Sequence, residues 1–116
     1  MNWNALTEIS QLEAIKKESY ESPVLIFKHS TTCSISQTAL ARLERNWKPE
    51  GVENLKIYYL DLLKNRQISN QIASIFEVVH ESPQVLLVEN GICTYDASHF
   101  AISYQEIKDK LSKKSQ

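Results

Sequence analysis

Cys33 stands where a reactive thiol is favoured. It follows the polar turn 29–32 and directly precedes a segment of helical periodicity that begins at Ser34. The unpaired N–H groups and the positive dipole end of a helix N-terminus stabilise an anion, so this position favours the thiolate. The thiolate is the form of cysteine that attacks disulfides. The hydroxyls of Thr32 and Ser34 are placed to donate hydrogen bonds to the sulfur.

A purely structural role for Cys33 is the alternative. Cysteines are among the most buried residues and often act as small hydrophobic side chains. The immediate neighbours of Cys33 are threonines and serines, whereas Ile35, Ala39 and Leu43 supply the apolar stripe of the following helix. We therefore interpret Cys33 as a functional thiol.

The position that would carry a resolving thiol holds a serine. A Cys-x-x-Cys motif places its second cysteine one helical turn after the first, and here that position is Ser36. Attack by Cys33 would then leave a mixed disulfide that an external small thiol must discharge. The pattern predicts monothiol chemistry.

Lys28 and the three histidines are the next candidates, because their side chains can carry a positive charge. His29 could face the sulfur and stabilise its charge, or it could pack beneath the turn, and the sequence leaves both open. Lys28 could add positive potential at the same place. His80 and His99 are isolated in loops, where a hydrogen-bonded or solvated structural role is the ordinary interpretation.

The sequence predicts alternating helices and strands, which would position the candidate site residues. The first half alternates helix with strand, which predicts parallel strands, and Asn90-Gly91 predicts a hairpin that adds an antiparallel pair. The expected fold is α/β, with a mixed four-stranded central sheet flanked by helices. The expected helices cover about 7–19 with Thr7 as N-cap, 34–48, 66–77 and a last one from about Ser103; the expected strands are 24–27, 55–61, 84–89 and 92–95.

Length and composition narrow the classes of function. The 116 residues are 42% apolar, which suits one domain over 1–116 with about four polar residues as a tail. A net charge of −1 argues against nucleic acid binding, and the absence of a long apolar segment or leader predicts no membrane insertion and a cytoplasmic location. Two cysteines and scattered histidines predict no metal site, and two glycines exclude a phosphate-binding loop.

Four short strings give the sequence a resemblance to a known family. They are His29-Ser30-Thr31-Thr32-Cys33 leading into Ile35-Ser36, His80-Glu81-Ser82-Pro83-Gln84, Asn90-Gly91 and Ser98-His99. Over roughly residues 20–102 the chain resembles the monothiol bacilliredoxins of the thioredoxin superfamily. The resemblance implies a thioredoxin-like fold and a small cytoplasmic oxidoreductase that removes bacillithiol from proteins carrying it as a mixed disulfide.

The resemblance also implies roles for individual residues. Cys33 would be the nucleophile and Pro83 the superfamily's cis-proline beside it. The family commonly has proline after the nucleophile, whereas here Ser34 offers an additional N–H donor. With Cys33 as the catalytic residue, the residues expected to bind the thiol or the substrate are His29, Thr32, Ser34, Ser36, Ser82 and Pro83.

The expected partners follow from that chemistry. We expect no tightly bound cofactor, a low-molecular-weight thiol such as bacillithiol as co-substrate, S-thiolated client proteins, and a monomer. Cys93 would lie in the last strand, at the sheet edge remote from Cys33, so we expect no disulfide between them. Two alternatives remain: a redox-inactive thioredoxin-like module that binds a protein, or a sensor in which Cys33 is itself modified.

Overall fold

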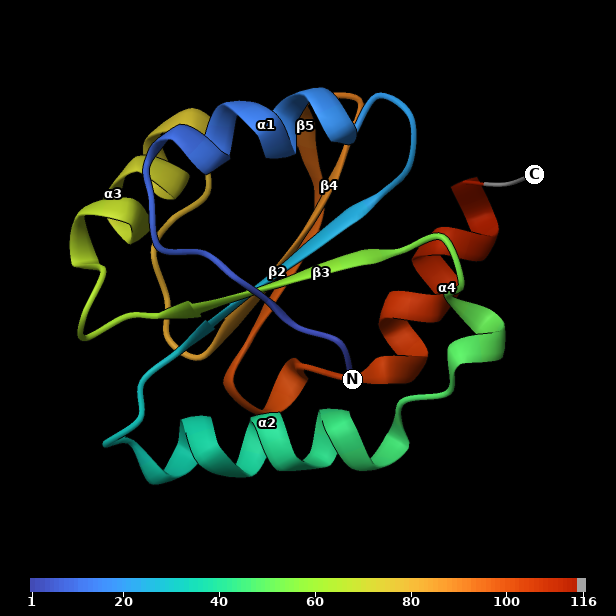
Figure 1. Ribbon diagram of the computed structural model, residues 1–116. Helices are drawn as coiled ribbons and strands as arrows, with labels where there is room; N and C mark the ends of the chain where they lie inside the picture. The colour runs from blue at the N-terminus through green and yellow to red at the C-terminus, as the bar shows by residue number, and fades with distance from the viewer. Residues whose placement is uncertain (115–116) are drawn as a thin grey trace.

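The computed structural model describes residues 1–114, which form one mixed sheet between two layers of helices (Figure 1). Within these residues the sheet has five strands in the order β1-β3-β2-β4-β5, so the expected α/β architecture is confirmed and the expected count of four strands is wrong. The elements are β1 (Asn4–Ala5), α1 (Ser10–Glu18), β2 (Val24–His29), α2 (Ser34–Asn46), η1 (Pro49–Gly51), β3 (Lys56–Asp61), α3 (Arg66–Ile75), β4 (Gln84–Glu89), β5 (Ile92–Ser98), η2 (His99–Ala101) and α4 (Tyr104–Lys114).

Strand β2 lies at the centre and is buried along its whole length. It pairs in parallel with β3 and antiparallel with β4. Its side chains alternate between two hydrophobic cores, because successive residues of a strand point to opposite faces. Ile26 packs on the face covered by α1 and α3, whereas Phe27 packs on the face covered by α2 and α4 (Figure 1).

The expected hairpin is also confirmed. Strands β4 and β5 pair antiparallel and are joined by Asn90 and Gly91, with φ of 53° and 79°. Positive φ at both central residues is the signature of a type I′ turn, which Asn-Gly favours. Strand β5 extends three residues beyond the expected end at Tyr95, to Ser98.

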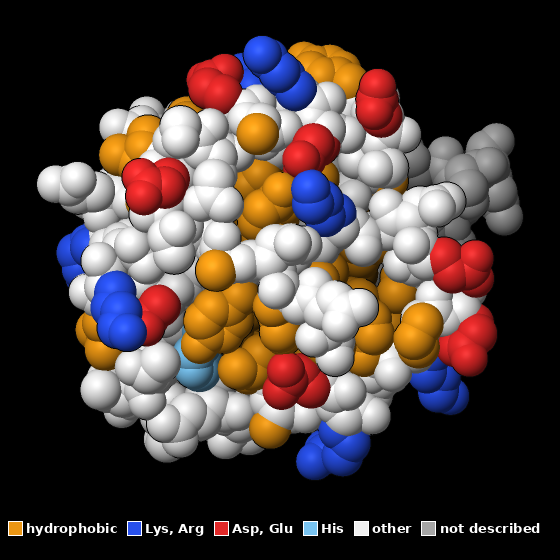
Figure 2. All heavy atoms as spheres, in the orientation of Figure 1, with side chains coloured by type: hydrophobic (Ala, Val, Ile, Leu, Met, Phe, Trp, Pro, Cys, Tyr) orange, Lys and Arg blue, Asp and Glu red, His pale blue; other side chains and the backbone are white. Residues whose placement is uncertain are grey.

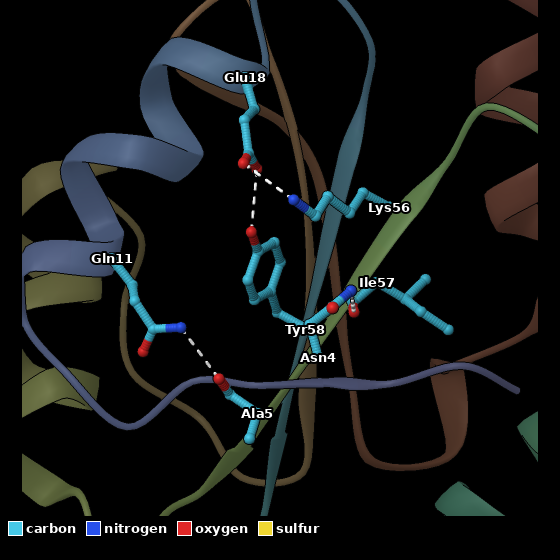
Figure 3. A network of polar contacts seen from close by, with 7 residues as sticks. All are labelled: Asn4, Ala5, Gln11, Glu18, Lys56, Ile57 and Tyr58. Carbon is cyan, nitrogen blue, oxygen red and sulfur yellow. Dashed lines mark hydrogen bonds and ion pairs between the residues drawn. The ribbon is translucent and has the colours of Figure 1, made fainter.

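The fifth strand, β1, carries no sequence pattern of its own. Its two residues are both exposed, so no alternation of apolar and polar side chains marks them. It pairs in parallel with β3, and the Asn4 side chain donates to the Ile57 carbonyl oxygen at 3.0 Å (Figure 3). Directly after it, Leu6 is completely buried. The strand forms because Leu6 anchors the chain against β3, a tertiary contact that local propensity does not reveal.

The start of α1 differs from the expected Thr7 cap. The helix begins at Ser10, and no side chain of its N-cap residue makes a capping bond. Instead Gln11 reaches back, and its Oε1 accepts from the N–H groups of Thr7 and Glu8. Its Nε2 donates to the Ala5 carbonyl oxygen (Figure 3). Gln11, a residue inside the first turn, therefore makes the hydrogen bonds at the helix start that are expected from Thr7.

The far end of α1 is also tied to the sheet. Glu18 pairs with Lys56 at 2.9 Å and accepts a hydrogen bond from the Tyr58 hydroxyl at 2.9 Å (Figure 3). Because Lys56 is half exposed, its pair with Glu18 adds little stability. The first helix is thus attached to β1 at its start and to β3 at its end.

The C-terminal helix and the surface complete the fold. The expected polar tail is partly helical, since α4 runs to Lys114, and residues 115–116 lie outside the described residues. Hydrophobic side chains gather in the middle of the face seen in Figure 2, and charged ones surround them. Over the described part of the chain, every helix is too short or too polar to cross a membrane.

Replacing Leu6 by alanine tests the anchoring of β1. Leu6→Ala should lower the free energy of unfolding by about 2–5 kcal/mol, because it empties a fully buried site in a packed core. Urea unfolding followed by circular dichroism measures this. The nearby Ile9→Ala variant, at a position 46% exposed, is the control and should change stability by less than about 0.5 kcal/mol. Equal effects would contradict the role of Leu6.

Candidate functional site at the Cys33 end of the sheet

Cys33 is the N-cap residue of α2 and is partly exposed. Its backbone is extended, with φ −102° and ψ 120°, and its carbonyl oxygen accepts the first intrahelical bond from the Gln37 N–H at 3.0 Å. Cys33 therefore stands at the helix start, where the first N–H groups lack intrahelical partners, and its side chain makes no capping hydrogen bond to them. The expected position of the thiol at a helix start is confirmed, and the sulfur is not sealed in the core.

The turn before Cys33 is held by backbone and side-chain hydrogen bonds. The Cys33 N–H donates to the Ser30 carbonyl oxygen at 3.2 Å, and the Gln37 side chain donates to the Thr31 carbonyl oxygen at 2.6 Å. Thr32 and Ser34, the two hydroxyl residues that flank the sulfur, are exposed. Both side chains are therefore accessible at the surface.

Ser36, in the position of a resolving thiol, is completely buried. Its Oγ accepts from the Ser30 N–H at 3.0 Å and lies 2.6 Å from Nδ1 of His29. The hydroxyl proton is then available to Nδ1 of a neutral imidazole, which assigns the remaining ring proton to Nε2. Ser36 therefore ties the first turn of α2 to the end of β2, and its side chain is closed to a ligand.

His29 packs beneath the turn, which decides between the two interpretations of this residue. It is only 4% exposed and lies against the Tyr59 ring at a centroid distance of 5.5 Å. Burial lowers the pKa of His29 below its ordinary value, although the charges of Asp61 and Glu44 oppose this. His29 is therefore neutral near pH 7 and adds no positive charge beside Cys33.

A second segment reaches the same end of the sheet. Lys28 pairs in register with Gln84, so Pro83, directly before Gln84, lies beside the end of β2. The Ser82-Pro83 peptide bond is cis, in agreement with the role that the resemblance implies for Pro83. The Pro83 carbonyl oxygen accepts from the His99 N–H at 3.0 Å, and the buried Ser82 Oγ has no hydrogen-bond partner among the described residues.

Lys28 does not face Cys33 as a source of positive potential. It lies on the same face of β2 as Ile26, beneath α3, and is completely buried. Its Nζ lies 3.2 Å from Nδ1 of His80, and the Ser69 Oγ lies 3.2 Å from the same nitrogen. This cluster is not predicted from the sequence. The alternation of side chains along β2 is the signal that points to it, because it places Lys28 and His29 on opposite faces.

Cys93 is far from this end. It pairs with Val88, which pairs with Val24 at the start of β2, whereas Cys33 follows the end of β2 at His29. Five residues of strand span about 17 Å, well beyond the 7 Å that a disulfide allows between Cα atoms. Both cysteines are free, as expected. Burial raises the pKa of the Cys93 thiol to about 11, so it is protonated at neutral pH.

A family model matches most of the chain. The family model described as "Monothiol bacilliredoxin BrxC" matches residues 4–107. The matched range includes Cys33, Ser36 and Pro83.

Among the described residues, no three His, Cys, Asp or Glu side chains gather where they could hold a metal ion.

Solved structures confirm the fold. A protein named only as a candidate oxidoreductase with a thioredoxin fold is similar at 29% identity and a TM-score of 0.74, over 97% of this chain and 92% of that one. Thioredoxin from Malassezia sympodialis has a TM-score of 0.74 at 12% identity, over 99% and 92%. Thioredoxin from Trypanosoma brucei brucei has a TM-score of 0.74 at 13% identity, over 98% and 91%. The chain has the thioredoxin fold.

Removing the Ser36 hydroxyl tests its structural role. Ser36→Ala should lower the free energy of unfolding by about 1–3 kcal/mol, because the Ser30 N–H and His29 Nδ1 lose their partner in a buried place. Chemical denaturation measures the change. Ser34→Ala, in the same helical turn but exposed, is the control and should stay within about 0.5 kcal/mol of the parent. An equally neutral Ser36→Ala would contradict the assignment.

Thiol labelling tests the difference between the two cysteines. Near neutral pH, iodoacetamide should modify Cys33 and leave Cys93 unmodified until the chain is unfolded. The raised pKa of Cys93 alone reduces its thiolate population by about a hundredfold. Mass spectrometry of the proteolysed protein, with a sample labelled in denaturant as control, gives both rates. Equal labelling of the two thiols in the folded protein would refute this ordering.

Proposed function

The chain belongs to the monothiol bacilliredoxin family of thiol oxidoreductases, and we propose that it reduces mixed disulfides between proteins and a low-molecular-weight thiol, bacillithiol, through a Cys33 thiolate. The observation that carries this proposal is a single partly exposed cysteine at a helix N-cap, with the resolving position filled by a buried serine. Such a site can accept a thiol group, but it cannot close a disulfide within its own motif.

Each step of the proposed reaction is an exchange at sulfur. The Cys33 thiolate attacks the bacillithiol sulfur of the client's mixed disulfide, and the client cysteine leaves as a thiolate that takes up a proton. A disulfide between Cys33 and bacillithiol results. A second bacillithiol then attacks as its thiolate, takes the first into a small-molecule disulfide and returns Cys33 as a thiolate. Over both steps, the mixed disulfide and one free bacillithiol give the reduced client and one bacillithiol disulfide. The added bacillithiol supplies the electron pair that the client sulfur takes up.

The residues around the sulfur divide into two groups in this proposal. Thr32 and Ser34 are exposed beside Cys33 and contact the incoming thiol. His29 and Ser36 are buried, so they act by fixing the first turn of α2 rather than by contact. No tightly bound cofactor takes part, because bacillithiol is a co-substrate.

The segment at Ser82 and Pro83 receives the client chain. Proline has no N–H, and the Pro83 carbonyl oxygen is already bonded to the His99 N–H. Among the described residues, the main-chain groups of Ser82 have no hydrogen-bond partner. Ser82 can therefore pair with an extended client segment as a further strand would. We place this reaction in the cytoplasm and propose that the protein acts on S-thiolated clients as a monomer.

Substituting each cysteine in turn tests the proposed chemistry. Cys33→Ser should reduce the release of bacillithiol from a bacillithiolated test protein to the rate of uncatalysed exchange, because serine cannot form the intermediate disulfide. Cys93→Ser is the matched control and should keep most of the activity, since Cys93 is remote and protonated. Mass spectrometry of the test protein follows the reaction, and the same protein carrying glutathione tests the choice of thiol. Activity that depends on Cys93 instead would end the proposal.

A further inference from the structure

Lys28 is a buried cation without a counter-charge. Its side chain has no exposed area although it sits on the central strand. Among the described residues the oppositely charged side chains within ion-pair distance of each other are Lys56 with Glu18 and, when the imidazole is protonated, His99 with Glu81. No carboxylate of these residues therefore lies within ion-pair distance of Lys28. Burying an unpaired ammonium costs free energy that an apolar residue would not. The presence of lysine at this position calls for a role other than packing.

The bond from Lys28 to His80 defines the protonation states of both groups. An ammonium only donates, so Nδ1 of His80 accepts and the imidazole is neutral. Burial lowers the pKa of His80, and the charges of Lys28 and Arg66 lower it further, against the opposing charge of Glu81. Burial also lowers the pKa of Lys28 to about 8. Near pH 7 the pair is therefore an ammonium donating to a neutral imidazole.

The same pair holds a loop against the sheet. The α3–β4 loop, residues 76–83, contains His80 and ends at Pro83. Gln84, the cross-strand neighbour of Lys28, donates to the Val79 carbonyl oxygen at 3.1 Å and accepts from the Glu81 N–H at 3.3 Å. Residues 79–81 are thus bonded to two adjacent side chains of the sheet. The only side-chain bond to His80 from a strand is that of Lys28 among the described residues.

We propose that Lys28 is a positioning residue, whose bond to His80 holds the α3–β4 loop so that Ser82 stands ready to pair with the client segment. This inference rests on the proposed function. In this inference Lys28 affects the binding of the client. It does not affect the reactivity of the Cys33 thiol, which depends on the start of α2. Losing the bond should therefore raise KM for a protein substrate and change kcat little.

The charge-assisted form of this bond exists only between two titrations. Protonation removes the lone pair of His80 and places a second cation against Lys28, whereas deprotonation of Lys28 removes the charge of the donor. The other charged groups that face the pair are Arg66 of α3 and Glu81 of the loop, which pairs with His99, while Asp96 of β5 lies 3.5 Å from the Gln84 amide nitrogen. KM should rise both below the pKa of His80 and above that of Lys28.

Two variants and two readouts test this inference. The substrate is an extended peptide whose cysteine carries bacillithiol, and the second readout is iodoacetamide alkylation of Cys33, which needs no client binding. Lys28→Met should raise KM near pH 7 by about ten- to a hundredfold, the factor that a hydrogen bond from a charged group contributes, and leave the alkylation rate unchanged. His80→Asn retains an acceptor that does not titrate, so its KM should stay near that of the parent and should not rise on acidification.

The outcomes separate this inference from the proposed function. Lys56→Met, the same change at an exposed lysine of the neighbouring strand, is the control and should leave KM unchanged. If the parent protein does not release bacillithiol from the peptide, the proposed function fails. If the parent is active but Lys28→Met keeps its KM at every pH, the positioning role is refuted. If Lys28→Met does not fold, His80→Asn decides: a KM that rises on acidification as in the parent refutes the role.

Discussion

Strand β2 is buried on both faces, and this places a demand on its last two residues, which are polar. Lys28 and His29 point to opposite faces, where neither can reach water, so each must find a partner in the segment packed above it. His29 finds Ser36 in the first turn of α2, and Lys28 finds His80 in the α3–β4 loop. The end of one strand thereby attaches the two segments that carry Cys33 and Pro83.

This attachment explains why the candidate site is built from segments far apart in the sequence. Ser36 lies seven residues from His29, whereas His80 lies fifty-two residues from Lys28. The two segments reach the same end of the sheet because β2 and β4 are neighbouring antiparallel strands, so the start of β4 lies beside the end of β2. The backbone pairing brings the segments to one end of the sheet, and the two polar side chains fix how each segment lies on it.

Local patterns predicted the elements that local forces determine. The apolar run of β2, the Asn-Gly turn and the helix that starts after Cys33 were all recognisable because their residues carry strong preferences of their own. Strand β1 was missed since its two exposed residues have no such pattern and depend on Leu6 packing against the core. The sequence predicts that Thr7 caps the first helix, whereas Gln11 makes the bonds at its start. Gln11 can do so because the chain at Ala5 passes within hydrogen-bond distance of its side chain. The partner of Lys28 depends likewise on a tertiary contact.

The serine at position 36 is more than a missing thiol. Its hydroxyl accepts from the Ser30 N–H and meets Nδ1 of His29 in a place closed to water. A thiol is a weaker donor and acceptor and makes longer contacts, so cysteine there would serve these two bonds less well. The hydroxyl therefore stabilises the turn before Cys33 at the position where a second thiol would complete an internal exchange. Position 36 can therefore hold a hydroxyl that stabilises the turn, or a thiol that resolves a disulfide within the motif. In this protein it holds the hydroxyl.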